Sequence, residues 1–167
     1  MTTLDQTPVL EAIRRFFEES GVRYEERRHA PTFTAQEAAD ARGEALEIGA
    51  KAIVAKVGKQ FRLFVMPSNR QLASRAICKH LKETRFRFAH RDELHELTGL
   101  VPGCVPPFGE PILPLPLYVD EAILQNEQVA FNAGSHTTSM LLSREDYLAL
   151  ARPQELFALT KRIEDAE

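Results

Sequence analysis

Three short segments carry residue types that could bind or react with a small polar substrate. In the first, Lys51 lies in an apolar run, with Ala50 and Ala52 beside it and Ile53 and Val54 after it. A lysine in such company either faces solvent or enters a pocket. In a pocket its ammonium can bind a phosphate or stabilise negative charge that develops on an ester. The pattern alone leaves both interpretations open.

The second segment is a loop rich in proline and glycine, Gly99 to Pro111. Its thirteen residues include three glycines, four prolines and Cys104. Proline restricts φ and removes a backbone donor, whereas glycine allows positive φ and close approach of the backbone. The composition therefore predicts a stiff loop and excludes a helix. Such a loop is either a rigid connection or a wall of a binding site whose amides face a ligand.

The third segment, Phe131 to Ser139, reads Phe-Asn-Ala-Gly-Ser-His-Thr-Thr-Ser. Gly134 and Ser135 can offer backbone amides, and His136 can donate, accept or transfer a proton near neutral pH. The alternative interpretation is structural, because a Gly-Ser pair often forms a bulge or hairpin. Neither interpretation is excluded by this segment alone.

The two cysteines, Cys78 and Cys104, are too few for a disulfide framework and show no zinc-ligand spacing, so we expect reduced thiols, no metal and no cofactor. Cys104 and His136 together suggest a thiol hydrolase, in which a thiolate attacks an acyl group and the histidine is its base. No apolar run is long enough to span a membrane, and the first residues lack the apolar segment of a signal peptide. We therefore expect a cytoplasmic protein.

Charge is distributed unevenly along the chain. The net charge is −3, yet residues 70–91 carry +6 and the remainder −9. Such a cationic surface on an acidic protein suits a polyanion held on one side, with binding that weakens as salt rises. It also suits an ordinary solvated helix face. The candidate binding residues are Arg70, Arg75, Lys79 and Lys82.

The positions of apolar residues predict alternating helices and strands. Thr34 with Glu37, and Ser143 with Asp146, have the form of N-terminal capping boxes. Pro114 and Pro116 make the strand that follows them an edge or bulged strand. We expect helices at 8–20, 35–42, from a cap at Ser68 or Asn69 to about Leu81, 91–98 and 144–151, and strands at 22–26, 50–57, 61–66, 86–88, 115–119, 128–132 and 137–142.

Four segments, in this order and rough spacing, resemble the YbaK and prolyl-tRNA-synthetase-associated editing-domain family. They are His29-Ala-Pro-Thr-Phe-Thr-Ala-Gln-Glu-Ala-Ala39, Ala-Lys-Ala-Ile-Val around Lys51, Gly99-Leu-Val-Pro-Gly103 with Val-Pro-Pro-Phe-Gly109, and the third segment described above. The resemblance extends from about Val9 to Ala151. It implies one α+β domain over residues 1–167, with a curved mixed or antiparallel sheet surrounded by helices.

The resemblance further implies an aminoacyl-tRNA deacylase that acts in trans on the ester of a mischarged tRNA. The expected substrate is tRNA for proline carrying alanine, cysteine, serine or threonine, with prolyl-tRNA synthetase as a possible partner. Its implied catalytic residues are Lys51, Gly103, Cys104, Gly134, Ser135 and His136, and its implied pocket residues are His29, Phe33, Ile53, Met66, Gly99 and Pro102. A tRNA-binding or synthetase-associated module without catalysis is the alternative.

Overall fold

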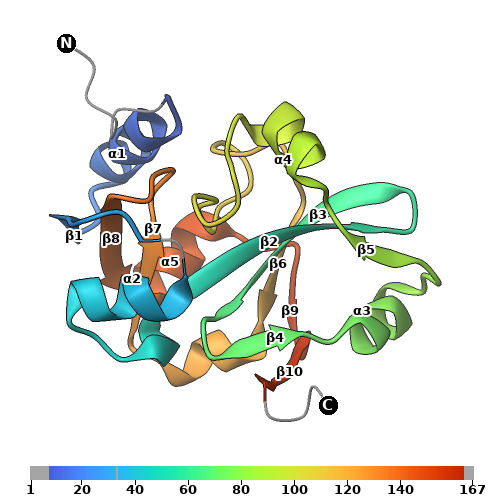
Figure 1. Cartoon of the computed structure of the whole chain (residues 1–167). Helices are drawn as coiled ribbons and strands as arrows, with labels where there is room; N and C mark the ends of the chain where they lie inside the picture. The colour runs from blue at the N-terminus through green and yellow to red at the C-terminus, as the bar shows by residue number, and fades with distance from the viewer. Residues whose placement is uncertain (1–7, 33, 164–167) are drawn as a thin grey trace.

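The computed structural model describes residues 8–32 and 34–163, in which helices and strands alternate along the chain (Figure 1). Five α-helices lie against mixed and antiparallel sheets in this part of the chain, which confirms the expected α+β class. None of the described helices is both long and apolar enough to cross a membrane.

Local signals set the bounds of the second helix. After α1 (Pro8–Ser20), helix α2 (Ala35–Arg42) begins where predicted, because the side-chain oxygen of Thr34 accepts a hydrogen bond from the amide of Glu37. Gly43 ends α2 with a φ of +70°, a conformation that glycine adopts without strain.

The largest sheet has five strands in the order β5-β2-β3-β6-β9. Its centre is the predicted hairpin, in which the antiparallel strands β2 and β3 are joined by a turn at Gly58 and Lys59. Strand β5 pairs antiparallel with the far end of β2, whereas β6 and β9 add in parallel. The strands are β2 (Ala50–Val57), β3 (Gln60–Pro67), β5 (Phe86–Phe88), β6 (Leu117–Asp120) and β9 (Glu155–Phe157).

A second, antiparallel sheet lies beside the start of β2. Its order is β1-β8-β7, with β1 (Tyr24–Arg28), β7 (Gln128–Asn132) and β8 (Thr138–Ser143). A single parallel bridge between Gly49 and Ala130 joins this sheet to the first. The short 3-10 helix η1 (Leu46–Ile48) leads into that bridge.

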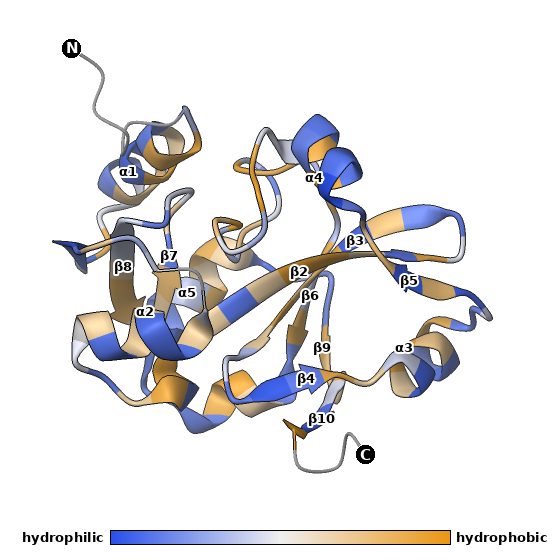
Figure 2. Ribbon diagram, viewed as in Figure 1, coloured by the Kyte–Doolittle hydropathy of each residue, from blue (hydrophilic) through white to orange (hydrophobic). Residues whose placement is uncertain are grey.

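Hydrophobic side chains fill both faces of the five-stranded sheet. The larger cluster lies between the two sheets and under α1, with Phe17, Phe108 and Phe131 in edge contact at its centre. The smaller cluster covers the opposite face under α3 (Ser74–Leu81) and includes Phe64 and Met66. Figure 2 shows hydrophobic residues along β6, and hydrophilic ones on β4, a strand of which only Leu72 belongs to the smaller cluster.

The segment after β3 differs from the sequence prediction. Ser68 and Asn69 do not cap a helix; the chain first forms β4 (Arg70–Leu72), and α3 begins only at Ser74. Strand β4 pairs with β10 (Thr160–Arg162), which the pattern did not predict. A distant strand at the end of the chain thus overrides the local helical signal at 70–73.

The strand expected at the sheet edge is another correction. Strand β6 pairs with β3 on one side and β9 on the other, so it is an interior strand. Pro114 and Pro116 precede it, and the carbonyl of Pro116 accepts a hydrogen bond from the amide of Leu63. The prolines therefore end the preceding loop without removing a donor from the strand. Strand β6 continues into the 3-10 helix η2 (Glu121–Gln125).

Candidate active site

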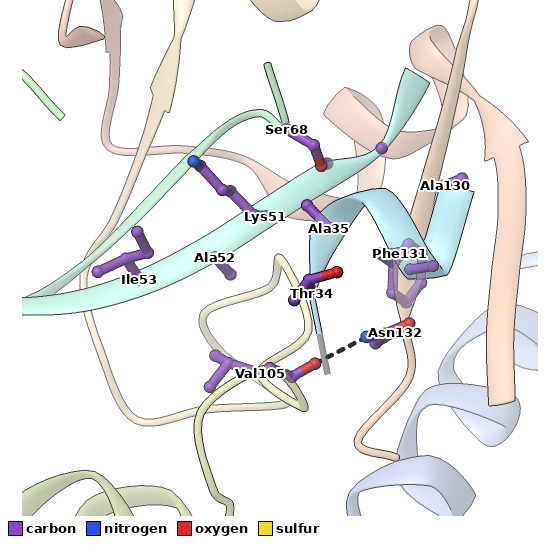
Figure 3. A pocket seen from close by; sticks show the side chains of 14 residues that line it. Thr34, Ala35, Lys51, Ala52, Ile53, Ser68, Val105, Ala130, Phe131 and Asn132 are labelled. Carbon is purple, nitrogen blue, oxygen red and sulfur yellow. Dashed lines mark hydrogen bonds between the residues drawn. The ribbon is translucent and has the colours of Figure 1, made fainter. Parts of the chain in front are cut away.

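A cavity of about 210 Å³ lies at the edge of β2 where the two sheets meet (Figure 3). Its walls come from α2, the first half of β2, the loop after α4 (Arg91–Thr98), and β7. Most of its lining side chains are small, which leaves the space open. The lining residues are Thr34, Ala35, Ala38, Gly49, Ala50, Lys51, Ala52, Ile53, Ser68, Gly103, Val105, Ala130, Phe131 and Asn132.

Lys51 brings the only lysine or arginine side chain among the described lining residues of this cavity. Within the described part of the chain its ammonium forms no ion pair or hydrogen bond. Burial lowers the pKa of the Lys51 ammonium below its ordinary value, since desolvation disfavours the charged form. The protein therefore holds a half-buried, uncompensated cation beside an empty space, which is the arrangement that binds an anion or a developing negative charge.

Three hydrogen bonds hold the proline- and glycine-rich loop against the second sheet and α5 (Arg144–Ala151). The Asn132 side-chain amide donates to the carbonyl of Gly103 at 2.8 Å. The backbone amide of Gly134 donates to the carbonyl of Cys104 at 3.0 Å. The buried Tyr147 hydroxyl donates to the carbonyl of Pro107 at 2.7 Å. The loop is therefore anchored along its length by its carbonyl oxygens, which leaves amides as the groups that can face a ligand.

Two of the amides expected to face a substrate are engaged within the protein. The amide of Cys104 donates to the carbonyl of Val101 at 3.1 Å, and that of Gly134 donates to Cys104, as described above. In contrast, no described partner accepts a hydrogen bond from the amides of Gly103 and Val105, and both residues line the cavity. Gly103 and Val105 are therefore better placed than Cys104 and Gly134 to offer donors.

The remaining predicted catalytic residues line a second, more open cavity of about 370 Å³ on the other side of the loop. This cavity is lined by the predicted catalytic residues Cys104, Gly134, Ser135 and His136. The predicted pocket residue Gly99 lines it too. Burial raises the pKa of the Cys104 thiol to about 11, so the thiolate needed for nucleophilic attack is scarce at neutral pH. The loop thus separates Lys51 from this group, with Gly103 at the boundary.

His136 packs directly against Gly103. Its Nδ1 lies 2.6 Å from the carbonyl oxygen of Thr32, and because a carbonyl only accepts, that nitrogen carries the proton. The amide of Thr32 in turn donates to the carbonyl of His136 at 3.0 Å. A Cβ added to Gly103 would lie 2.9 Å from Cε1 of His136, so only glycine fits this contact.

Asn132 is a site residue that the sequence analysis did not single out, although it lies in the third segment. Its Oδ1 accepts a hydrogen bond from Ser139 Oγ at 3.2 Å, and Ser139 Oγ lies 2.8 Å from Nε2 of His29. His29, expected to line the pocket, therefore acts behind it, at the end of a chain of hydrogen bonds that leads through Asn132 to Gly103. The asparagine beside the Ala-Gly pair was the available signal.

The other predicted pocket residues do not all line the Lys51 cavity. Ile53 lines the Lys51 cavity, whereas Met66 is fully buried in the smaller core cluster. Pro102 is exposed and lines neither of the two cavities, and Phe33 lies outside the described residues. Thr34 and Ser68, which were not predicted, add hydroxyl groups to the cavity wall. No cluster of three or more potential metal ligands occurs in the described part of the chain.

The basic residues of segment 70–91 do not all have free charges. Arg70 is held by Thr160 and lies 3.7 Å from the buried carboxylate of Asp120. Arg75, Lys79 and Lys82 are exposed, and within residues 8–32 and 34–163 they form no ion pair. These three remain candidates for binding a polyanion, whereas Arg70 has a structural role.

Replacing Gly103 with alanine should destabilise the protein more than the same change at Gly21. Both glycines have positive φ, +89° and +70°, where an alanine costs about 1–2 kcal/mol. Space is open around Gly21, but at Gly103 the new methyl group would displace the ring of His136, which adds about 1–3 kcal/mol. Denaturant unfolding of both variants measures the difference. Equal losses would show that His136 does not restrain Gly103.

Comparison with known proteins identifies the family of this chain. The aminoacyl-tRNA editing domain family matches residues 29–150. The chain is 36% identical over 119 residues to the multifunctional Ser/Thr-tRNA deacylase ProXp-y of Escherichia coli K12, which covers 68% of this chain and 70% of that protein. The same protein from Escherichia coli O157:H7 matches equally.

A solved structure assigned as a trans-editing enzyme for prolyl-tRNA synthetase has the same fold. It superposes with a TM-score of 0.79 at 28% identity, over 93% of this chain and 99% of that chain. The matched residues 29–150 include Lys51, the proline- and glycine-rich loop and the third segment. The chain therefore belongs to the aminoacyl-tRNA editing domain family, as its sequence motifs predicted.

Proposed function

We propose that the Lys51 cavity is where this protein hydrolyses the ester between a small amino acid and the 3′ end of a tRNA, in trans. Aminoacyl-tRNA deacylation is the activity that family membership and the relatives support. The observation that carries the assignment to this cavity is the uncompensated Lys51 ammonium at a cavity that the anchored loop also lines. We further propose that residues 1–167 form one editing domain and that it works in the cytoplasm.

The reaction requires a positioned water and a place for negative charge. Water attacks the carbonyl carbon, and the carbonyl oxygen becomes a tetrahedral oxyanion; the ester C–O bond then breaks, and a proton from the attacking water passes to the departing ribose oxygen. Lys51 and the amides of Gly103 and Val105 are the groups that would stabilise the oxyanion. Because the loop is already held in place, these donors need no reorganisation as charge develops.

The size of the cavity favours a small aminoacyl group. Alanine side chains line it on three sides, from α2, β2 and β7. Ser68 is buried there, and its hydroxyl could bond to the hydroxyl of a serine or threonine ester. A ProXp-y relative that acts on Ser- and Thr-tRNA supports the same preference. We propose serine and threonine as the preferred groups, with alanine and cysteine as weaker ones.

The tRNA itself would be bound through exposed cations. We propose Arg75, Lys79 and Lys82 as phosphate contacts, since each is exposed and unpaired among described residues. The solved trans-editing enzyme for prolyl-tRNA synthetase supports tRNA for proline as the carrier and that synthetase as a possible partner. A tRNA-binding module without catalysis would keep these contacts but would not need the Lys51 cavity.

Lys51→Met should abolish most deacylation without loss of stability. Loss of one such charge-stabilising group lowers kcat by about 10²–10³-fold. The methionine stem fills the same space and removes the cost of burying an unpaired ammonium, so the melting temperature should stay equal or rise. The measurement is hydrolysis of tRNA charged with serine, threonine, alanine, cysteine or proline, beside thermal unfolding. Full activity in Lys51→Met would remove Lys51 from the mechanism.

The pH profile provides a separate test of the charged form of Lys51. Burial lowers the pKa of this group, so the ammonium is lost at a lower pH than for an exposed lysine. We expect kcat/KM, corrected for spontaneous hydrolysis, to fall on the alkaline side below the ordinary lysine range. In Lys51→Arg, whose guanidinium stays charged, any remaining activity should show no such fall. The same alkaline fall in both proteins would assign it to another group.

Cys104→Ser discriminates the proposed mechanism from a thiol hydrolase. The buried thiol has a raised pKa and faces the second cavity, so we expect kcat/KM to fall less than about tenfold, which is about 1.4 kcal/mol. Cys78→Ser is the matched control, because Cys78 lies in α3 away from both cavities. Complete loss of activity in Cys104→Ser alone would support the Cys104 and His136 pair instead.

A further inference from the structure

Phe88 in β5 is the most exposed large hydrophobic residue in the described part of the chain, at 55%. Its ring meets that of Phe86 edge-on, with 5.4 Å between centroids, so one face is left open to solvent. A single exposed aromatic residue is common on protein surfaces and carries no argument by itself. Its position relative to the Lys51 cavity is what makes Phe88 a candidate binding residue.

The sheet places Phe88 on the same face as Lys51. Phe88 lies opposite Ala55 in the antiparallel pair of β5 and β2. Side chains of a strand alternate between faces, so Lys51, Ile53 and Ala55 project to one side of β2, together with Phe88. Figure 3 shows Lys51 and Ile53 on this side and Ala52 on the other.

The part of β2 between the two places is not paired with β5. Pairing with β5 covers only Ala55 to Val57, and one further hydrogen bond joins the amide of Ala89 to the carbonyl of Val54. Ala55 is four positions after Lys51, which is about 13 Å along the strand. Figure 1 shows β5 beside the far part of β2, whereas α2 lies at its beginning, near the cavity.

Two exposed cations lie near the Gly58 turn, at the other end of β5 from Phe88, and the carboxylate of Glu83 lies beside the same turn. The amide of Gly58 donates to the carbonyl of Arg85, which brings Arg85 beside the turn that carries Lys59. Both are exposed, and neither forms an ion pair with a described residue. Arg87, in contrast, is paired with Glu93 on the opposite face. Proteins that bind single-stranded nucleic acid combine exposed aromatic side chains, on which bases stack, with cations along the same surface that attract phosphates.

We propose that Phe88 stacks against a base in the single-stranded 3′ end of the tRNA whose ester lies in the Lys51 cavity. At the stacked spacing of roughly 3.4 Å, 13 Å corresponds to about four nucleotides before the ester. The proposal rests on the proposed function, because it needs the aminoacyl end to be in that cavity. Stacking on Phe88 adds a second contact, which tolerates any base and aligns the single-stranded end of the tRNA with β2.

Fluorescence tests the contact directly, because the chain contains no tryptophan. In Phe88→Trp the new indole should be quenched by uncharged tRNA, and this quenching should disappear with tRNA that lacks its single-stranded 3′ nucleotides. Leu124→Trp is the control, since Leu124 is similarly exposed, at 46%, but lies in η2. No quenching of Phe88→Trp, or equal quenching by the truncated tRNA, would overturn the proposal.

Kinetics separate this proposal from the proposed function. Phe88→Ala should raise KM for aminoacyl-tRNA about fivefold to a hundredfold with little change in kcat. Phe88→Tyr, which keeps an aromatic ring, should have the KM of the unmodified protein. With 3′-aminoacyl-adenosine, which has no base at that distance, Phe88→Ala should match the unmodified protein. An unchanged KM for tRNA, or an equal defect on both substrates, overturns the stacking role. Failure of the unmodified protein to hydrolyse either substrate would instead reject the proposed function.

Discussion

The arrangement of this site depends on the hydrogen bonds that hold the carbonyl oxygens of one loop. Asn132, the amide of Gly134 and Tyr147 each donate to a different carbonyl between Gly103 and Pro107. Buried carbonyls must find donors, and here the donors come from β7, the segment after it, and α5. Because the loop's acceptors are satisfied from behind, its conformation is settled before any ligand arrives. The part of the cavity wall that this loop forms is therefore rigid.

In the proposed mechanism, that rigidity increases the effect of the Lys51 charge. An ammonium in water is solvated by mobile dipoles, whereas Lys51 is partly desolvated and has no partner among the described residues. Its interaction with a developing oxyanion is stronger in such surroundings. The desolvation free energy of this charge lowers the stability of the folded state. Cys104, by contrast, sits behind the wall, where burial raises the pKa of its thiol to about 11, and we propose that it shapes the loop without reacting.

Local sequence signals predicted most elements and several of their ends. Thr34 and Gly43 mark the two ends of α2, and the Gly58-Lys59 turn marks the position of the β2-β3 hairpin. These were predictable because capping and turn geometry depend on a few adjacent residues. The prediction was wrong at Ser68 and Asn69, where pairing of β4 with β10 replaced the start of a helix. It was also wrong for β6, which is an interior strand because the end of the chain returns to pair with it.

The sequence by itself determined the kind of chemistry: a lysine in an apolar strand, a stiff loop, and a polar segment around Ala133 and Gly134, in the order typical of an editing domain. Only the tertiary structure decided how these parts are divided. It placed Gly103 on the side of Lys51, and Cys104 with His136 on the other side of the loop. Which side a loop residue faces depends on donors supplied by distant strands. No pattern of neighbouring residues contains that information, and so the hydrogen bond from Asn132 to the carbonyl of Gly103 was visible only in the fold.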